Sequence, residues 1–272
     1  MSEPATEAVR VQDEAGPDGR AGAIRVVTID RPRALNAIDV ATMTELLRVF
    51  EACSSAPGLR VVIVTGAGER AFVAGADVAA LSTMSPEQAA AFSELGHRVG
   101  HAMEALPVPV IGAVNGFALG GGCELALACD FVYATTAARF GFPEARLGAI
   151  PGFGGTVRLV QRIGLPRARE LLYTAETVDA AEALRLGLVN RVVEPAALLT
   201  EVRRTAAVIC GRAPLAVASA KQALRDNAAL VATEALRREV ERFAALFATD
   251  DLRLGMRAFL DKAAGTPAWQ GR

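Results

Sequence analysis

The sequence predicts an α/β fold, because strand patterns alternate with amphipathic helix patterns over most of the chain. The clearest strand is LRVVIVT (residues 59–65), whose β-branched residues are typical of a strand buried on both faces of a sheet. After about residue 195 the strand pattern stops, and the chain becomes rich in Ala, Leu, Arg and Glu. We therefore expect two regions, a mixed core over residues 1–195 and a helical region over residues 196–272.

The elements of the core are expected in a regular order. Residues 9–11 and 24–29 read as strands joined by the turn-rich segment DEAGPDGRAG. Asp39 is a candidate N-cap for a helix to about residue 52, with an apolar face of Met43, Leu46, Leu47 and Phe50. The rest of the core is expected to contain strands at 59–65, 108–114 and 131–134 and helices at 86–106 and 123–129.

The helical region carries one strong apolar stripe. Leu236, Val240, Phe243 and Phe247 recur at the spacing of a single helix face. Two interpretations fit this stripe equally well, namely a helix packed on its own core and a contact between subunits.

Composition excludes several classes of function. The chain has 272 residues, of which 52% are hydrophobic, and a net charge of −1, so it can bury a large core and has no basic excess for nucleic acid or an anionic membrane. None of the four cysteines forms a CxxC pair, and the first residues lack a secretory apolar segment. We expect reduced thiols and a cytoplasmic protein.

The longest apolar run, residues 108–128, has the length of a membrane span. Pro109, Asn115, glycines and Glu124 interrupt it, and a lipid-facing helix tolerates such a mixture poorly. A buried strand, a loop and the start of a helix explain this run better.

Two glutamates, Glu124 and Glu144, stand in the glycine-rich apolar stretches GFALGGGCELALACD and FGFPEARLGAIPGFGG. Burying a carboxylate in such surroundings is costly, so it is usually kept for chemistry or for an ion pair. The glycine run 120–122 precedes the helix of Glu124, and free amides at a helix N-terminus can hold an oxyanion. Tight helix–strand packing explains the glycines alone equally well.

Five segments in order identify a family resemblance: RPRALNAID, AFVAGADV, VNGFALGGGCELALACD, FGFPEARLGAIPGFGGTVRL and AEALRLGLVNRVV. Together they resemble the crotonase superfamily, in particular the enoyl-CoA hydratases, over essentially the whole chain from about residue 9. The resemblance implies a crotonase-like spiral of ββα units followed by a C-terminal helical region. It also implies a homotrimer or a dimer of trimers, with an acyl-CoA as substrate and with no metal or other cofactor.

The resemblance also implies roles for particular residues. The thioester carbonyl would lie between the backbone NH groups of Ala76 and Gly121, with Glu124 and Glu144 as the catalytic pair. Positions that match the CoA-binding segments of the family are Arg33, Ala34, Leu35, Ala74, Ala76, Asp77, Val78, Ala79 and Gly120. Phe259 and Lys262 match positions that close over CoA, often on a neighbouring subunit. Many hydratases have Gln where this chain has Phe142, so we expect a reshaped acyl pocket.

These residue types suit the hydration of a 2-enoyl thioester. Two amides can stabilise the developing enolate without being consumed. Two carboxylates around one water can activate that water for attack at C3 and protonate C2. Burial and mutual repulsion are expected to leave one proton shared by the pair. We expect Glu124 mainly to orient and activate water, and Glu144 mainly to transfer the proton at C2.

Other interpretations remain open or are excluded. An isomerase, decarboxylase or hydrolase acting on an acyl-CoA stays possible, as does a non-catalytic acyl-CoA-binding scaffold. VVIVTGAGER lacks the third glycine and the acidic residue of a dinucleotide site. A Clp-type serine peptidase would need a Ser nucleophile beside the glycine run.

A few conspicuous residues are expected to be structural. His97 and His101 have no third metal ligand near them in the sequence. Asp77 is expected to cap the following helix, and GFGGT to form a tight turn before another. Trp269 is expected to be a packing anchor.

Overall fold

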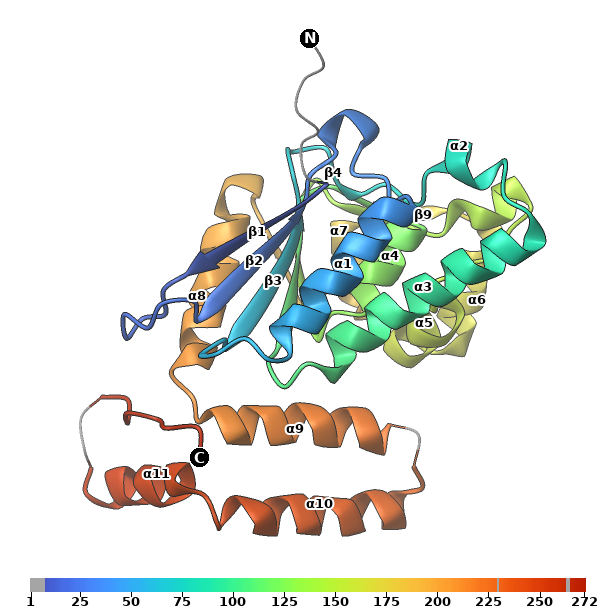
Figure 1. Cartoon of the computed structure of the whole chain (residues 1–272). Coiled ribbons are helices and arrows are strands. Elements are labelled where there is room, and N and C mark those ends of the chain that lie inside the picture. Colours follow the sequence, from blue (N-terminus) through green and yellow to red (C-terminus); the bar gives the residue numbers. More distant parts are fainter. Residues whose placement is uncertain (1–7, 229, 263–264) are drawn as a thin grey trace.

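A computed structural model describes residues 8–228, 230–262 and 265–272 of the chain (Figure 1). Its larger sheet has six strands in the order β1-β2-β3-β5-β7-β10. Only β1 and β2 pair antiparallel, and the other neighbours are parallel. The strands span Val9–Glu14 (β1), Ile24–Ile29 (β2), Val61–Gly66 (β3), Val110–Val114 (β5), Phe131–Thr135 (β7) and Arg191–Val193 (β10).

A second sheet of four short strands has the order β4-β6-β8-β9. These strands are Ala71–Val73 (β4), Phe117–Leu119 (β6), Arg139–Gly141 (β8) and Thr177–Asp179 (β9). The chain adds one strand to the large sheet and then one to the small sheet, as in β3–β4, β5–β6 and β7–β8, with helices following each pair. This repeat is the expected spiral of ββα units.

Helices cover both sheets of the core. They are Val40–Cys53 (α1), Val78–Leu81 (α2), Pro86–Ala105 (α3), Gly121–Leu127 (α4), Gly155–Ile163 (α5), Leu165–Thr174 (α6), Ala180–Leu186 (α7) and Leu198–Cys210 (α8). Short 3-10 helices span Pro32–Ala34, Pro143–Leu147 and Pro195–Ala197. The Asp39 side chain accepts a hydrogen bond from Thr42 N, which confirms the N-cap expected for α1.

The two faces of the large sheet belong to two different apolar clusters. Strand β3 is buried along its whole length, as its β-branched sequence predicted. Val61 and Ile63 face a cluster completed by Leu198, Val202 and Ala206 of α8. The alternate side chains of β3 face the main core under α1, α3 and α4. Side chains alternate between faces along a strand, so one β-branched run serves both clusters.

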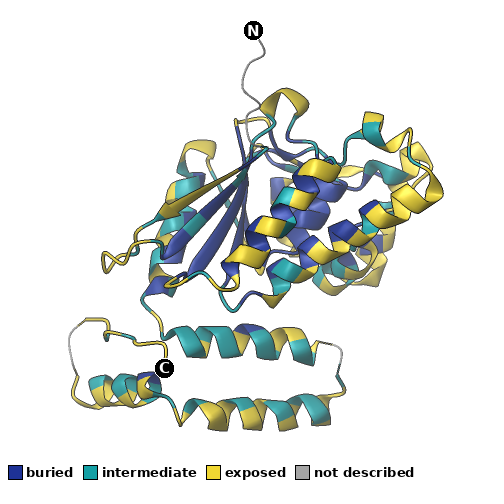
Figure 2. Ribbon diagram, in the orientation of Figure 1, coloured by how far each residue is buried: buried dark blue, intermediate teal, exposed yellow. Residues whose placement is uncertain are grey.

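Three helices form a separate layer beside the core: α9 (Pro214–Asn227), α10 (Ala232–Leu246) and α11 (Asp250–Leu260) (Figure 1). The buried Lys221 joins α9 to the core, because its Nζ donates to the carbonyl oxygens of Met103 and Val108 and pairs with Asp130. In Figure 2, α10 shows only intermediate and exposed residues, whereas the strands of the core are largely buried.

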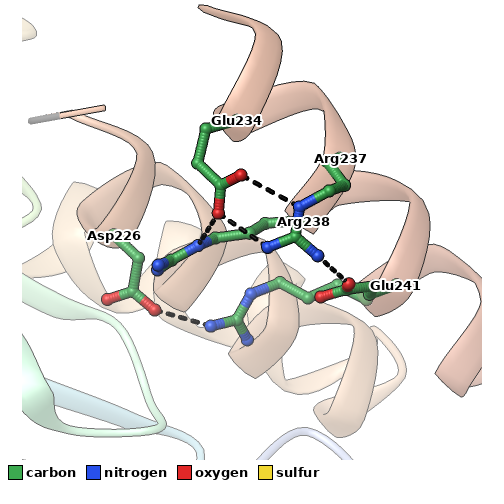
Figure 3. Close-up of polar contacts among 6 residues, drawn as sticks. Asp226, Glu234, Arg237, Arg238 and Glu241 are labelled. Carbon is green, nitrogen blue, oxygen red and sulfur yellow. Dashed lines mark hydrogen bonds and ion pairs between the residues drawn. The ribbon is translucent and has the colours of Figure 1, made fainter. Parts of the chain in front are cut away.

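An ion pair joins α10 to α9 at Asp226, and others lie within α10 (Figure 3). Arg242 of α10 reaches Asp226 of α9 at 2.6 Å, while Glu234 pairs with Arg237 and Arg238 within α10. Hydrogen bonds from the two arginines lower the pKa of Glu234 to about 2.

The main elements lie where the sequence predicted them, with small shifts at their ends. The helix expected from residue 123 begins at Gly121, inside the glycine run. The region expected to be helical begins with α8, which packs on the large sheet instead of joining the α9–α11 layer. The change in composition at about residue 195 does not coincide with a change in packing, because α8 belongs to the core. The division into two regions at residue 195 stays a prediction.

Candidate active site

The candidate site lies where three parallel strands of the small sheet end. Register pairs Val73 of β4 with Ala118 of β6, and Leu119 of β6 with Gly141 of β8. The segments that leave these strands therefore emerge side by side at the carboxyl edge of the sheet. They carry Ala76, the Gly120–Gly122 run and Glu144, which brings three distant parts of the sequence together.

Ala76 and Gly121 are neighbours at this edge of the small sheet. Ile38 bonds to both neighbours of Ala76, donating to Gly75 O and accepting from Asp77 N, so the Ala76 amide points away from Ile38. Gly121 is the first residue of α4, where amides have no partner within the helix. A methyl group placed on Gly121 would lie 3.7 Å from Ala76 N. The fold thus brings Ala76 and Gly121 close together, although they come from two different segments of the chain.

Glu124 lies in the first turn of α4 with only 2% of its surface exposed. Its Oε1 accepts hydrogen bonds of 2.7 Å from both Phe153 N and Gly155 N. Burial raises the pKa of Glu124 to about 7, and the nearby Glu144 charge adds to that rise, while the two amide bonds oppose it. A carboxyl that titrates near neutrality can exchange a proton at working pH.

Glu144 approaches the same space from the 3-10 helix after β8. Its Oε1 lies 2.5 Å from the position that a methyl group on Gly120 would occupy, so the side chain rests on the glycine run. Its Oε2 is buried and has no hydrogen-bond partner among the described residues. Burial also raises the pKa of Glu144. Both carboxyls therefore favour a proton more than an exposed glutamate does.

The segments expected along the CoA channel also lie together. Ala74 N donates to Leu35 O, which places Arg33, Ala34 and Leu35 beside the Ala74–Ala79 loop. Arg33, Ala34, Val78 and Ala79 are exposed, as residues that meet a ligand at the mouth of a site would be. The Asp77 side chain accepts hydrogen bonds from Ala79 N and Ala80 N, which confirms its expected capping of α2.

Asn36 holds this pair of loops and was not identified from the sequence. It is fully buried in a left-handed backbone conformation, with φ of 58°. Its amide donates to the carbonyl oxygens of Ala67 and Ala71. Its side-chain oxygen Oδ1 accepts a hydrogen bond from Arg31 N. The sequence does contain a signal for this role, namely an Asn in the turn that follows Pro32. Asn tolerates the left-handed backbone region better than most residues do.

The loop of residues 153–155 is the second feature that sequence reasoning missed. Its two amides bind Glu124, and Arg158 of α5 holds the loop by donating to Phe153 O at 2.8 Å. Arg158 in turn pairs with Glu104 of α3. The segment GFGGT had been expected only to form a tight turn, and it does so, with Gly154 in the left-handed region before α5.

Phe259 and Lys262 lie apart from the two glutamates within one chain. Phe259 is 84% exposed and lines an apolar pocket between α9, α11 and the C-terminal segment. Trp269 lines the same pocket and donates from its indole NH to Gly211 O, so it anchors this layer.

Neither a metal site nor a membrane-spanning helix is present among the described residues. His97 and His101 are exposed on α3. Across the described ranges, no three His, Cys, Asp or Glu side chains gather as metal ligands would. In that same part of the chain, no helix combines the length and apolar character that crossing a membrane requires.

Comparisons with known proteins show the family and the fold of the chain. A family model described as enoyl-CoA hydratase/isomerase matches residues 19–272. The chain is 45% identical over 239 residues to a crotonyl-CoA hydratase of Syntrophomonas wolfei, covering 88% of this chain and 92% of that protein. It is also 45% identical over 241 residues to a short-chain-enoyl-CoA hydratase of Clostridium acetobutylicum, covering 89% and 92%. The crystal structure of an enoyl-CoA hydratase from Bacillus anthracis superposes with a TM-score of 0.92 at 36% identity, covering 98% of this chain and 100% of that one.

Proposed function

The chain belongs to the enoyl-CoA hydratase/isomerase family, and from this membership and the site geometry we infer that it is a hydro-lyase that adds water reversibly to trans-2-enoyl-CoA. The product is a 3-hydroxyacyl-CoA, and we assign the addition to one face of the double bond (syn). The observation that carries this assignment is the buried Glu124 and the partly buried Glu144, both with a raised pKa, beside the neighbouring residues Ala76 and Gly121.

In the proposed reaction, the amides of Ala76 and Gly121 hold the thioester oxygen. Negative charge that develops on this oxygen as the enolate forms is stabilised by both donors, which need no reorganisation. Each such donor is worth roughly 3–4 kcal/mol where it has been measured. CoA would run past four exposed residues of two neighbouring segments, Arg33, Ala34, Val78 and Ala79.

The two carboxyls would divide the proton transfers. Glu124, ionised and with one oxygen held by the Phe153 and Gly155 amides, takes a proton from water as the water oxygen bonds to C3. Glu144, protonated, delivers its proton to C2 from the oxygen that has no hydrogen-bond partner among the described residues. The net change is addition of one water, and the chemistry calls for no metal or redox group.

The test follows loss of the conjugated enoyl-thioester absorbance with crotonyl-CoA and longer trans-2-enoyl-CoAs. We expect turnover by the wild type and losses of roughly 10²–10⁴-fold in Glu124→Gln and Glu144→Gln. The double variant should lose little more than either single one, because groups that act as a unit are not additive. Absence of wild-type turnover at every chain length would refute hydration and favour another acyl-CoA reaction.

We further propose that the chain forms a homotrimer or a dimer of trimers. The stripe of Leu236, Val240, Phe243 and Phe247 is exposed on α10, and contiguous exposed apolar surface marks contact sites. A neighbouring subunit would cover it, and Phe259 and Lys262 could then close over the CoA of that neighbour.

Light scattering after size exclusion measures the assembly directly. We expect a wild-type mass of three or six protomers and a smaller mass for Phe243→Asp. Leu184→Asp, at an exposed apolar residue of α7 outside the stripe, should keep the wild-type mass. A monomeric wild type would contradict the proposal.

The proposed location is the cytoplasm, and the four free, buried cysteines support it.

A further inference from the structure

We propose that the ring of Phe153 closes the acyl pocket and makes this chain selective for short trans-2-enoyl-CoAs with about four carbons in the acyl chain. The inference rests on the proposed hydratase function and narrows it to a chain length. It assigns to Phe153 a role that the sequence had suggested for Phe142.

The Phe153 ring spans the gap between α3 and α4. One of its edges lies against Gly96 of α3, where an added methyl group would come within 2.1 Å of Cδ1. The opposite edge lies against Gly121 of α4, where an added methyl group would come within 2.8 Å of Cε2. Only residues without a side chain leave room for the ring at both contacts, so the two glycines and the phenylalanine form one packing unit.

The ring is also tied to the position of the reacting carbons. Gly121 supplies one amide for the thioester oxygen, and the backbone NH of Phe153 itself binds Glu124. A substrate with its carbonyl oxygen at Gly121 and its C3 beside Glu124 therefore lies along the same residues that surround the ring. Carbons beyond C4 would extend toward the ring and the wall of α3.

Little space remains on that side of the site. The cavity beside Glu124 is lined by side chains of α1, α3 and α4 and by Phe153, and it measures about 10 Å³. That is room for roughly one water molecule and not for further methylene groups.

The ring cannot swing aside easily, because its surroundings are packed. It is 8% exposed, and Phe92 of α3 meets it edge to face with ring centroids 5.1 Å apart. Arg158 fixes the backbone of the same residue through its carbonyl oxygen.

Phe142 lies elsewhere. Its ring is 1% exposed within the main apolar core and does not line the cavity beside Glu124. It therefore offers a matched control: a phenylalanine two residues from Glu144 that is buried but outside the proposed acyl wall.

The experiment compares kcat/KM for trans-2-enoyl-CoAs of four, six, eight and ten carbons in wild type, Phe153→Ala, Phe153→Leu and Phe142→Leu. One methylene in an apolar pocket changes specificity by about 10-fold or more. We expect the wild-type ratio of eight-carbon to four-carbon activity to lie below about 0.1 and to rise at least ~10-fold in Phe153→Ala. The ratio for Phe153→Leu should lie between those of wild type and Phe153→Ala, and Phe142→Leu should keep the wild-type ratio.

A binding measurement separates this inference from the reaction. Calorimetric titration with butyryl-CoA and octanoyl-CoA, which are saturated and cannot be hydrated, should show tighter butyryl-CoA binding in wild type and a reversed order in Phe153→Ala. If Phe153→Ala does not fold, Phe153→Leu carries the same test with a smaller expected change.

Each outcome has a distinct meaning. A wild type that hydrates four and ten carbons equally well would overturn the inference, as would Phe153 variants that slow all chain lengths by one factor. An equal shift of the ratio in Phe142→Leu would also overturn it. A wild type that hydrates none of the substrates but binds butyryl-CoA more tightly than octanoyl-CoA would refute the hydratase assignment. The same result would support the role of Phe153 in the acyl pocket.

Discussion

Replacing Glu124 by Gln should stabilise the protein in a pH-dependent way. The Glu124 carboxyl is 2% exposed, and burial raises its pKa from 4.5 to about 7. Gln has nearly the same size and keeps an oxygen for the Phe153 and Gly155 amides, but it carries no charge. The variant therefore removes the cost of burying a carboxylate and little else.

The magnitude follows from linkage between protonation and folding. Between pH 4.5 and about 7 the folded protein binds more protons at Glu124 than the unfolded chain does, so wild-type stability falls as pH rises through this window. A rise in pKa from 4.5 to about 7 corresponds to about 3 kcal/mol of lost stability, complete above the folded pKa. Glu124→Gln should match wild type near pH 4.5 and exceed it by about 3 kcal/mol at pH 8.

The assay is urea unfolding of both proteins from pH 4.5 to 8.5 at one protomer concentration, because assembly makes stability concentration-dependent. Thermal unfolding should show the same trend, because each kcal/mol of added stability raises the Tm of a domain of this size by about 2–4 °C. The Glu144 carboxyl is more exposed, and its pKa is also raised. Glu144→Gln should therefore increase the free energy of unfolding at high pH as well, but by less than Glu124→Gln does. A stability difference for Glu124→Gln that is constant with pH would refute the reasoning.

Three further predictions concern the supports of the site and the C-terminal layer. Arg158→Met removes a positive charge that lowers the pKa of Glu124, so the acid limb of the kcat/KM profile should move to higher pH. Arg162→Met, four residues further along α5, should leave that limb in place, because the Arg162 guanidinium donates to the carbonyl oxygens of Leu127 and Cys129 and not to the loop that binds Glu124. Gly122→Ala should fold poorly, measured as soluble yield, because its methyl group would lie 2.0 Å from a carbonyl oxygen of β4. Asp251→Ala should cost about 2–3 kcal/mol, because its buried carboxylate accepts hydrogen bonds from two backbone amides of the C-terminal segment. The fluorescence of the chain's single tryptophan should then shift to the red at lower urea, and an unchanged midpoint would contradict this role.

Local pattern predicted most of the secondary structure. The β-branched run of β3 and the capped, amphipathic pattern of α1 depend only on neighbours a few residues apart, so they can be read from the sequence alone. The two glutamates and the glycine run were also identified from the sequence, since a charged residue in an apolar stretch is conspicuous in one dimension. Their roles in the reaction came from the family resemblance.

Contacts between distant segments could not be predicted in this way. The direction of the Ala76 amide depends on a bridge to Ile38. The Phe153 amide that binds Glu124 and opposes the rise of its pKa comes from a loop 29 residues away. The sequence drew attention to Phe142 as a residue that reshapes the acyl pocket, and only packing shows that the ring of Phe153 lies between α3 and α4.

The sequence by itself thus determined the α/β class, the order of the strands and helices, and which carboxyls stand among glycines. Only the tertiary structure decided how those carboxyls are held, which backbone segments lie beside them, and which aromatic ring packs between α3 and α4. The physical reason is that periodicity and capping act over one or two turns of chain. Burial, pKa and pocket shape instead depend on the register of two sheets and the packing of helices across them.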